Sequence, residues 1–186
     1  CSVGKMYTAL ALDEAMRRKG MKSTFRATGQ TGILITGHGV PLDAVIADFM
    51  AGSIEYLTPD NDADHWDIIE GQGSLFHVSY SGVTMALIHG GQPDALILSH
   101  DPTRKTMRGL PDYTLPSLED LRDMALTLAR VANPDCKVVG ISVNTQHMSE
   151  DVAVSYLADV EAKMGLPAVD PFRHGAGRLV DALAAM

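Results

Sequence analysis

Short apolar segments of strand length alternate with amphipathic segments of helical period along this 186-residue sequence. The apolar segments lie at residues 23–28, 66–70, 94–100 and 137–144. The helical segments lie around them, at residues 4–20, 41–57, 83–90, 117–131, 149–165 and 177–186. Strands that alternate with helices in this way favour a parallel sheet that helices cover on both faces. We therefore predict an α/β, doubly wound fold with three layers.

Local signals place the ends of these elements. Gly20 is expected to end the first helix, and Ser117 and Ser149 are expected to cap two later ones. Pro41 is expected to begin the helix over 41–57, with Leu42, Val45, Ile46, Phe49 and Met50 on one face. Between the first strand and this helix, the glycine-rich stretch ATGQTGILITGHG is expected to form a flexible binding turn.

Composition restricts the class of protein. A chain of 186 residues with 46% hydrophobic and 20% charged residues suits a single domain with one core. The net charge of −8 argues against a nucleic-acid partner, and no apolar segment is long enough to cross a membrane. The only cysteines are Cys1 and Cys136, without the spacing of a metal site or disulfide framework. A cytoplasmic protein with reduced thiols is expected.

The stretch CSVGKMYT at the start is typical of the second half of a phosphate-binding loop. In such a loop the backbone N–H groups, the helix N-terminus and a lysine surround an anion. We predict a cofactor-binding segment formed by Ser2, Val3, Gly4, Lys5, Met6, Tyr7 and Thr8. Met6 occupies the place of a magnesium-binding hydroxyl, which argues against magnesium-dependent hydrolysis. The glycine and strand that open such loops would precede residue 1, so a longer parent chain is expected.

The stretch EGQGSLFHVSYSG follows the second predicted strand. Ligands of open α/β sheets bind at the carboxyl ends of the strands, where Glu70 is expected to lie. We predict Glu70 as a general base, and capping of a neighbouring helix or pairing with a lysine is its structural alternative. His77 and Asp48 are further candidate bases, and Gln72 and Ser74 are candidate substrate ligands.

Other polar residues are candidates for the same site. Gln30 and Thr31 of the glycine-rich stretch and Arg104 of a small basic cluster are predicted substrate ligands, and Arg26 is a further cation. Asp48 lies among Ala44, Ala47, Ala51 and Gly52, a small-residue face that would admit another backbone closely and favours a homo-oligomer. The histidine spacing matches no metal motif, so no metal site is predicted.

Several longer motifs in register resemble the P-loop domain of the D-glutamate N-acetyltransferase-like family, formerly a domain of unknown function. They are CSVGKMYTALAL, ATGQTGILI, DAVIADFMAGSIE, EGQGSLFHVSYSGVT, QPDALILSHDP and GISVNT. The lysine loop and the EGQG stretch are more distantly similar to dethiobiotin synthetase. The resemblance implies a P-loop NTPase-like fold and a parent chain with an N-terminal Rossmann-like domain.

The resemblance also implies an activity, the transfer of an acetyl group from acetyl-CoA to the amino group of D-glutamate. The phosphate loop would then hold the phosphates of coenzyme A without hydrolysing them. An ATP- and Mg²⁺-dependent ligase or kinase resembling dethiobiotin synthetase is the alternative, as is a non-catalytic nucleotide-binding domain. All three would have a small-molecule ligand.

Overall fold

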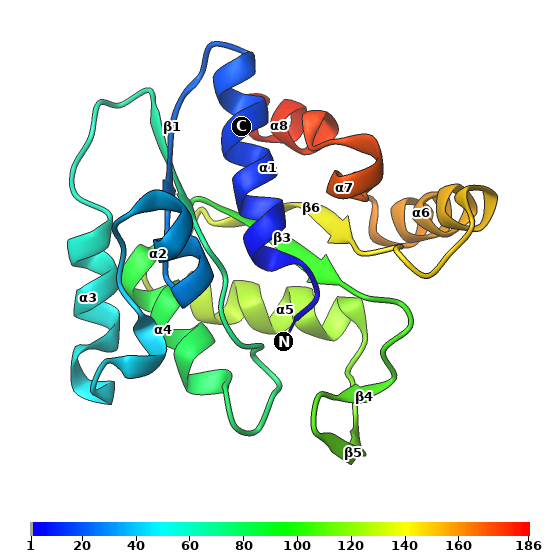
Figure 1. Cartoon of the computed structure of the whole chain (residues 1–186), viewed down its shortest axis with the longest axis horizontal. Helices are drawn as coiled ribbons and strands as arrows, with labels where there is room; N and C mark the ends of the chain where they lie inside the picture. Colours follow the sequence, from blue (N-terminus) through cyan, green and yellow to red (C-terminus); the bar gives the residue numbers. More distant parts are fainter. Residues whose placement is uncertain (1) are drawn as a thin grey trace.

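The computed structural model describes residues 2–186 and contains the expected alternation of helices and strands (Figure 1). The first half holds α1 (Lys5–Arg18), β1 (Lys22–Arg26), α2 (Gln30–Thr36), two 3-10 turns η1 (Leu42–Ala44) and η2 (Ala47–Phe49), α3 (Met50–Leu57), β2 (His65–Ile69) and α4 (Ser81–Gly91). The second half holds β3 (Ala95–His100), β4 (Thr106–Met107), β5 (Leu110–Thr114), α5 (Leu118–Ala129), β6 (Lys137–Val143), α6 (Glu150–Met164), β7 (Ala168–Val169), α7 (Pro171–His174) and α8 (Gly177–Ala184).

The main strands are parallel and form two separate sheets. β1 pairs with β2, from Lys22 opposite His65 to Arg26 opposite Ile69. β3 pairs with β6, and β6 pairs with β7. β4 and β5 form a short antiparallel hairpin at one end of the molecule (Figure 1).

Helices cover both faces of these sheets. The first core cluster joins α1 and α8 to β1, β2 and β6, through residues that include Leu12, Phe25, Ile68, Val139 and Leu179. The second joins α5 and α6 to β3 and β6, through residues that include Leu98, Leu121, Ile141, Leu157 and Val160. Neighbouring residues of β6, Val138 and Val139, belong to opposite clusters because strand side chains alternate between faces. The predicted three-layer α/β fold is confirmed.

Most of the predicted helix ends are confirmed. α1 ends at Arg18, and Gly20 follows with a φ of 77°, a backbone conformation that glycine adopts without strain. Ser117 caps α5 through a complete capping box with Asp120. Ser149 is the N-cap residue of α6, but its side chain makes no capping hydrogen bond.

Two predictions about residues 27–57 are wrong. The glycine-rich stretch is not a flexible turn, because Gln30–Thr36 form α2. The helix expected from Pro41 begins only at Met50, since η1 and η2 precede it and Val45 is extended. Ile46 and Phe49, predicted to face the core, are 71% and 65% exposed. Leu42, Val45 and Met50 do pack into a core cluster with α3 and α4, so the apolar residues of this segment are buried only in part and without one continuous helix.

The small-residue face predicted around Asp48 does admit a close neighbour, at Ala51. A Cβ atom built on Gly90 of α4 would collide with the backbone carbonyl of Ala51 in α3. The neighbour therefore belongs to the same chain, and α3 and α4 pack tightly because Gly90 lacks a side chain. Gly52, on the same helix, faces open space.

Candidate active site

The N-terminal loop and the first turn of α1 have the backbone geometry of an anion cradle. Ser2 and Gly4 have φ values of 55° and 99°, and Gly4 is the N-cap residue of the 14-residue helix α1. Because glycine has no side chain, no side chain of the N-cap residue caps the helix. The backbone N–H groups of the first helical turn therefore lack intrahelical partners and add to the positive end of the helix dipole. This geometry is the one predicted from CSVGKMYT.

Lys5 supplies the charge of this cradle. Burial and the nearby guanidinium of Arg104 lower the pKa of Lys5 from 10.5 to about 8, although the carboxylate of Glu70 opposes this shift. Among the residues that the structure describes, the Lys5 ammonium has no hydrogen bond and no ion pair. The aliphatic stem of Lys5 packs against Gly71, where a Cβ atom would lie 3.0 Å from the lysine Cδ. An ammonium that is largely withdrawn from water and has only the carboxylate of Glu70 to oppose its charge favours an anionic ligand.

The other side chains of the cradle are used by the fold. Met6 packs against the first core cluster, so only its backbone can face an anion. The buried Thr8 hydroxyl donates to the carbonyl of Gly4 at 3.0 Å and lies 2.7 Å from the hydroxyl of Ser142. No signal in the sequence links Thr8 to Ser142, which lies 134 residues later, on β6. Tyr7 is half-exposed and its ring packs against that of Phe172 in α7.

Glu70 lies directly after β2 and is 3% exposed. Its Oε2 accepts hydrogen bonds from the backbone N–H groups of Thr28 at 2.9 Å and Gly29 at 3.0 Å. Gly29 is the N-cap residue of α2, so Glu70 caps this helix from another element. The helix-capping role that we considered as the structural alternative for Glu70 is thus present. Glu70 also lines the cavity that contains Lys5.

The loop after Glu70 connects the cavity to the β4–β5 hairpin. His77 is buried, its Nε2 lies 3.0 Å from the carbonyl oxygen of Arg108, and its Nδ1 accepts from the N–H of Ser79. Since a carbonyl can only accept, His77 carries its proton on Nε2. Both ring nitrogens are then engaged, which indicates that His77 positions the hairpin.

The hairpin brings basic side chains to the cradle. The guanidinium of Arg108 donates to the Ser2 hydroxyl, and that of Arg104 donates to the Ser2 carbonyl at 3.4 Å. Arg104 and Lys105 line the same cavity as Lys5. Arg26, by contrast, pairs with Asp67 across β1 and β2 at 2.6 Å, so its charge serves the sheet.

A second polar group lies at the carboxyl end of β3. The Nε2 of His100 is 2.7 Å from the hydroxyl of Tyr156 in α6, and their rings are stacked. Burial lowers the pKa of His100, so the imidazole is held neutral. Both residues line the cavity, yet Tyr156 gave no sequence signal because α6 reaches β3 only through the tertiary fold.

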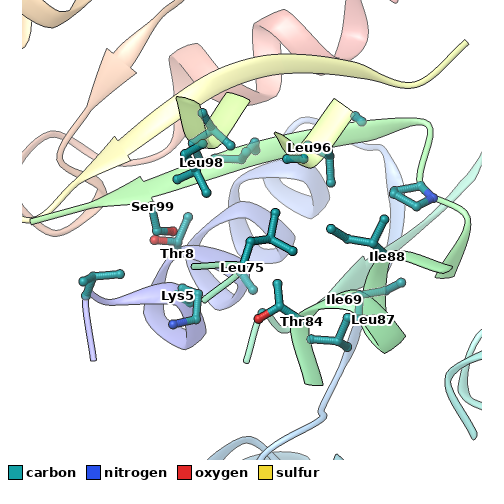
Figure 2. Close-up of a pocket in the computed structure, with 18 of the residues that line it drawn as sticks. Lys5, Thr8, Ile69, Leu75, Thr84, Leu87, Ile88, Leu96, Leu98 and Ser99 are labelled. Carbon is teal, nitrogen blue, oxygen red and sulfur yellow. The ribbon is translucent and has the colours of Figure 1, made fainter. Parts of the chain in front are cut away.

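One cavity of about 1160 Å³ brings together part of the predicted site, with Lys5 and Thr8 on one of its sides (Figure 2). Val3, Lys5, Thr8, Glu70, Gln72, Ser74 and Arg104 line it. Gln30 and Thr31 are exposed in the first turn of α2, and Asp48 is exposed on η2; none of these three lines the cavity. The described residues contain no cluster of three or more potential metal ligands and no helix of the length and hydropathy needed to span a bilayer.

Comparison with known proteins gives the family. The model of a domain of unknown function, the P-loop domain DUF1611_C, matches residues 1–180. The chain belongs to the DUF1611 family. A solved DUF1611 family protein from Anabaena variabilis is 39% identical and superposes with a TM-score of 0.92, over 100% of this chain and 55% of that one.

Two curated relatives of this DUF1611 domain carry the name D-glutamate N-acetyltransferase. The relative from Tritonibacter scottomollicae is 81% identical over 186 residues, which are all of this chain and 56% of the relative. The relative from a Pseudoalteromonas species is 49% identical over 180 residues, 97% of this chain and 54% of the relative. The chain therefore spans about half the length of the curated relatives it matches.

Proposed function

We propose that this domain is the coenzyme-binding half of an acetyltransferase that moves an acetyl group from acetyl-CoA to the amino group of D-glutamate. The observation that carries the proposal is the 81% identity, over every residue, to a protein named for this activity. The cradle supports it, since Lys5, the N-terminus of α1 and the basic hairpin suit the phosphates of coenzyme A. Coenzyme A supplies the activated thioester, and nothing in this assignment requires phosphate hydrolysis.

The reaction needs a base and a polarised thioester carbonyl. The base takes one proton from the substrate ammonium, the nitrogen bonds to the acetyl carbon, and the carbon–sulfur bond breaks as the thiolate leaves. The second proton that the nitrogen loses goes to the thiolate and gives the coenzyme A thiol. We assign Glu70 as the base, because its carboxylate lines the cavity beside Lys5. Arg104 and Lys105 are the proposed partners of the substrate carboxylates. We assign the backbone N–H groups of the glycine-rich loop that begins at Gly71 to the oxyanion.

The alternative ligand is Mg²⁺-ATP, which the phosphate loop would also suit. The structure offers it little support at Met6, where a magnesium-binding hydroxyl would stand, or at Thr8, the nearest threonine. Met6 packs into the core, and the Thr8 hydroxyl is engaged with Gly4 and Ser142. We therefore place acetyl-CoA first, and expect the full-length polypeptide to bind acetyl-CoA in a calorimeter. Binding of Mg²⁺-ATP without binding of acetyl-CoA would overturn the proposal.

Turnover of the full-length polypeptide tests the reaction and the role of Glu70. Release of the coenzyme A thiol is measured with D-glutamate and with L-glutamate as acceptors, and we expect the D-enantiomer to be preferred. Glu70→Gln should lower kcat by about 10²- to 10⁴-fold. The amide oxygen of glutamine can still accept from Thr28 and Gly29, so this variant should keep its fold. Asp43→Asn, an exposed change on η1, is the matched control; full turnover in Glu70→Gln would remove Glu70 as the base.

A further inference from the structure

His100 and Tyr156 form a polar pair in the cavity to which neither the assigned base nor the phosphate cradle gives a role. The Nε2 of His100 lies 2.7 Å from the hydroxyl oxygen of Tyr156, which is the distance of a short hydrogen bond. The two rings are stacked, with their centroids 6.0 Å apart and their planes inclined by 19°. The hydrogen bond and the stacking together fix the two polar atoms relative to each other.

The fold holds this pair in one place. His100 is the last residue of β3, and its backbone carbonyl accepts from the N–H of Asn144 at 2.8 Å. Leu98, which lies on the same face of the strand, is buried in the second core cluster, and Tyr156 of α6 packs against that cluster. The pair therefore stands on the α5 and α6 side of the sheet, whereas Lys5 belongs to α1 on the other side.

The carboxyl end of β3 also lies next to the anion cradle. Ser99, the last residue but one of this strand, is opposite Ser142 of β6. The hydroxyl of Ser142 lies 2.7 Å from that of Thr8 in α1. Arg104, in the loop after β3, is close enough to Lys5 for its charge to lower the pKa of the lysine. The pair thus reaches the reacting groups from a different layer than the cradle, at the same edge of the sheets.

Both rings are held in their neutral forms. Burial lowers the pKa of His100, although the carboxylate of Asp101 opposes this shift, and burial raises the pKa of Tyr156, although the ammonium of Lys163 opposes it. Asp101 accepts hydrogen bonds within its own turn, and Lys163 pairs with Glu119 at 2.7 Å. Two neutral groups that share a hydrogen bond can pass a proton onward without leaving an unpaired buried charge behind.

Each member of the pair has a second polar position that is available to a ligand. Within the part of the chain that the structure describes, Nδ1 of His100 makes no hydrogen bond, and it is open to solvent. When Nε2 carries the ring proton and donates it to Tyr156, Nδ1 has a free lone pair. The hydroxyl proton of Tyr156 can then point at a further acceptor, since the described residues offer this hydroxyl no second partner. The pair thus presents a proton acceptor at one end and a proton donor at the other.

We propose that His100 and Tyr156 form a proton relay, which carries the second proton of the substrate nitrogen to the leaving thiolate of coenzyme A. The nitrogen gives this proton to Nδ1 of His100, Nε2 passes its own proton to the hydroxyl oxygen of Tyr156, and the hydroxyl proton goes to the sulfur. The carbon–sulfur bond breaks, the thiol forms, and both side chains end neutral, with the imidazole proton moved from Nε2 to Nδ1. Glu70 takes the first proton, as assigned above. The relay rests on the proposed function, because it has no task without a thioester.

Removal of the phenol hydroxyl tests the donor end of the relay. In the full-length polypeptide, Tyr156→Phe should lower kcat for release of the coenzyme A thiol by about 10²-fold. The KM for acetyl-CoA should stay unchanged, because neither member of the pair belongs to the phosphate cradle. Tyr56→Phe removes the same hydroxyl from an exposed tyrosine of α3 and is the matched control, with unaltered turnover expected.

A glutamine at position 100 separates the relay from a merely structural contact. The amide of His100→Gln can still hydrogen-bond to the hydroxyl of Tyr156, but it cannot take up a proton at one atom and release one at another. This variant should therefore lose as much kcat as Tyr156→Phe and should unfold at the same urea concentration as the unaltered protein. The double variant should lose no more than either single one, since a relay is lost whole once one member is gone.

The outcomes separate this inference from the proposed function. Full turnover in either Tyr156→Phe or His100→Gln would overturn the relay and leave the proposed function intact. Losses that multiply in the double variant would show that the two residues act separately, which would also overturn the relay. If the unaltered polypeptide released no thiol from acetyl-CoA with any glutamate enantiomer, the proposed function itself would be refuted, and the relay with it.

Discussion

Single residues of the site serve both the fold and the chemistry. Glu70 caps α2 with the same carboxylate that we assign as a base, and a Cβ atom on Gly32 would collide with that carboxylate. Lys5 is the opposite case, since its ammonium forms no ion pair among the described residues, and its burial makes the charge costly although the carboxylate of Glu70 opposes this effect. The sequence identified both residues from their glycine-rich surroundings. It could not indicate their burial or partners, because these depend on distant elements: Thr28 lies 42 residues before Glu70, and Lys5 meets Gly71 and Arg104 from later parts of the chain.

Lys5→Met should stabilise the domain and abolish anion binding. The folded pKa of about 8 lies below the usual 10.5, so the unfolded chain binds the proton more tightly. Below pH 8 the full penalty of the charge is present, and it disappears as pH rises from 8 towards 10.5. We expect the variant to be more stable by about 1–3 kcal/mol at pH 7, with a smaller gain at pH 10. Urea unfolding at both pH values measures this.

The lowered pKa of Lys5 should also make anion binding depend on pH. Affinity of the unaltered protein for inorganic pyrophosphate should fall as pH rises above 8, because the Lys5 ammonium then loses its proton. Lys5→Arg is the control, since guanidinium stays charged across this range. A stability gain for Lys5→Met that did not shrink at high pH would contradict the assigned cause.

At the scale of elements, local signals predicted what local physics determines. The capping box at Ser117 and the glycine after α1 act within a few residues, and both are confirmed. The predictions for residues 27–57 were wrong because the structure of this segment depends on contacts with distant parts of the chain. Glu70, which follows β2, caps α2. Without this contact, the glycines of the segment are typical of a loop, and so the sequence predicted one. The hairpin of β4 and β5 was missed because β4 has only two residues and β5 is mostly exposed, so neither has the buried apolar pattern of the other strands.

Two glycine substitutions should separate packing from propensity in the α3–α4 pair. Gly90→Ala should destabilise the domain by about 1–3 kcal/mol, because the new methyl group meets the Ala51 carbonyl. Gly52→Ala adds the same methyl group to α3 where the structure has open space, and should stabilise by about 0.5–1 kcal/mol. Thermal and urea unfolding measure both. Equal effects of the two changes would show that α3 and α4 are not packed as described.

At the scale of the whole molecule, the parallel strands lie in two sheets, and the cavity that contains Lys5 forms a slot between them. Its edges, along β2 and β3, carry backbone groups without strand partners on that side. Exposed strand edges are sites of association between chains. The predicted homo-oligomer therefore has two distinct possible origins, a native interface of the full-length protein and an adventitious pairing at the open slot.

Residues 1–186, prepared alone, should associate through this slot. We expect light scattering to show a mass that increases with concentration in the micromolar range, whereas the full-length polypeptide keeps one defined mass. Ile97→Pro is unsuitable as a probe because β3 is also needed inside the domain. Asp67→Lys is also unsuitable because it breaks the pair with Arg26. The full-length chain itself is the control, and a monomeric 186-residue chain at every concentration would refute the expectation.

The sequence by itself determined the order of the main elements, the phosphate-loop half-motif at Lys5, and the placement of Glu70 at a strand end. These follow from periodicity, capping and turn chemistry, which act over a few residues. Only the tertiary structure decided that Glu70 caps α2, that His77 holds the basic hairpin, and that one cavity brings Lys5, Glu70 and Arg104 together. Those facts depend on contacts between distant segments, whose formation is set by burial and backbone pairing rather than by local pattern.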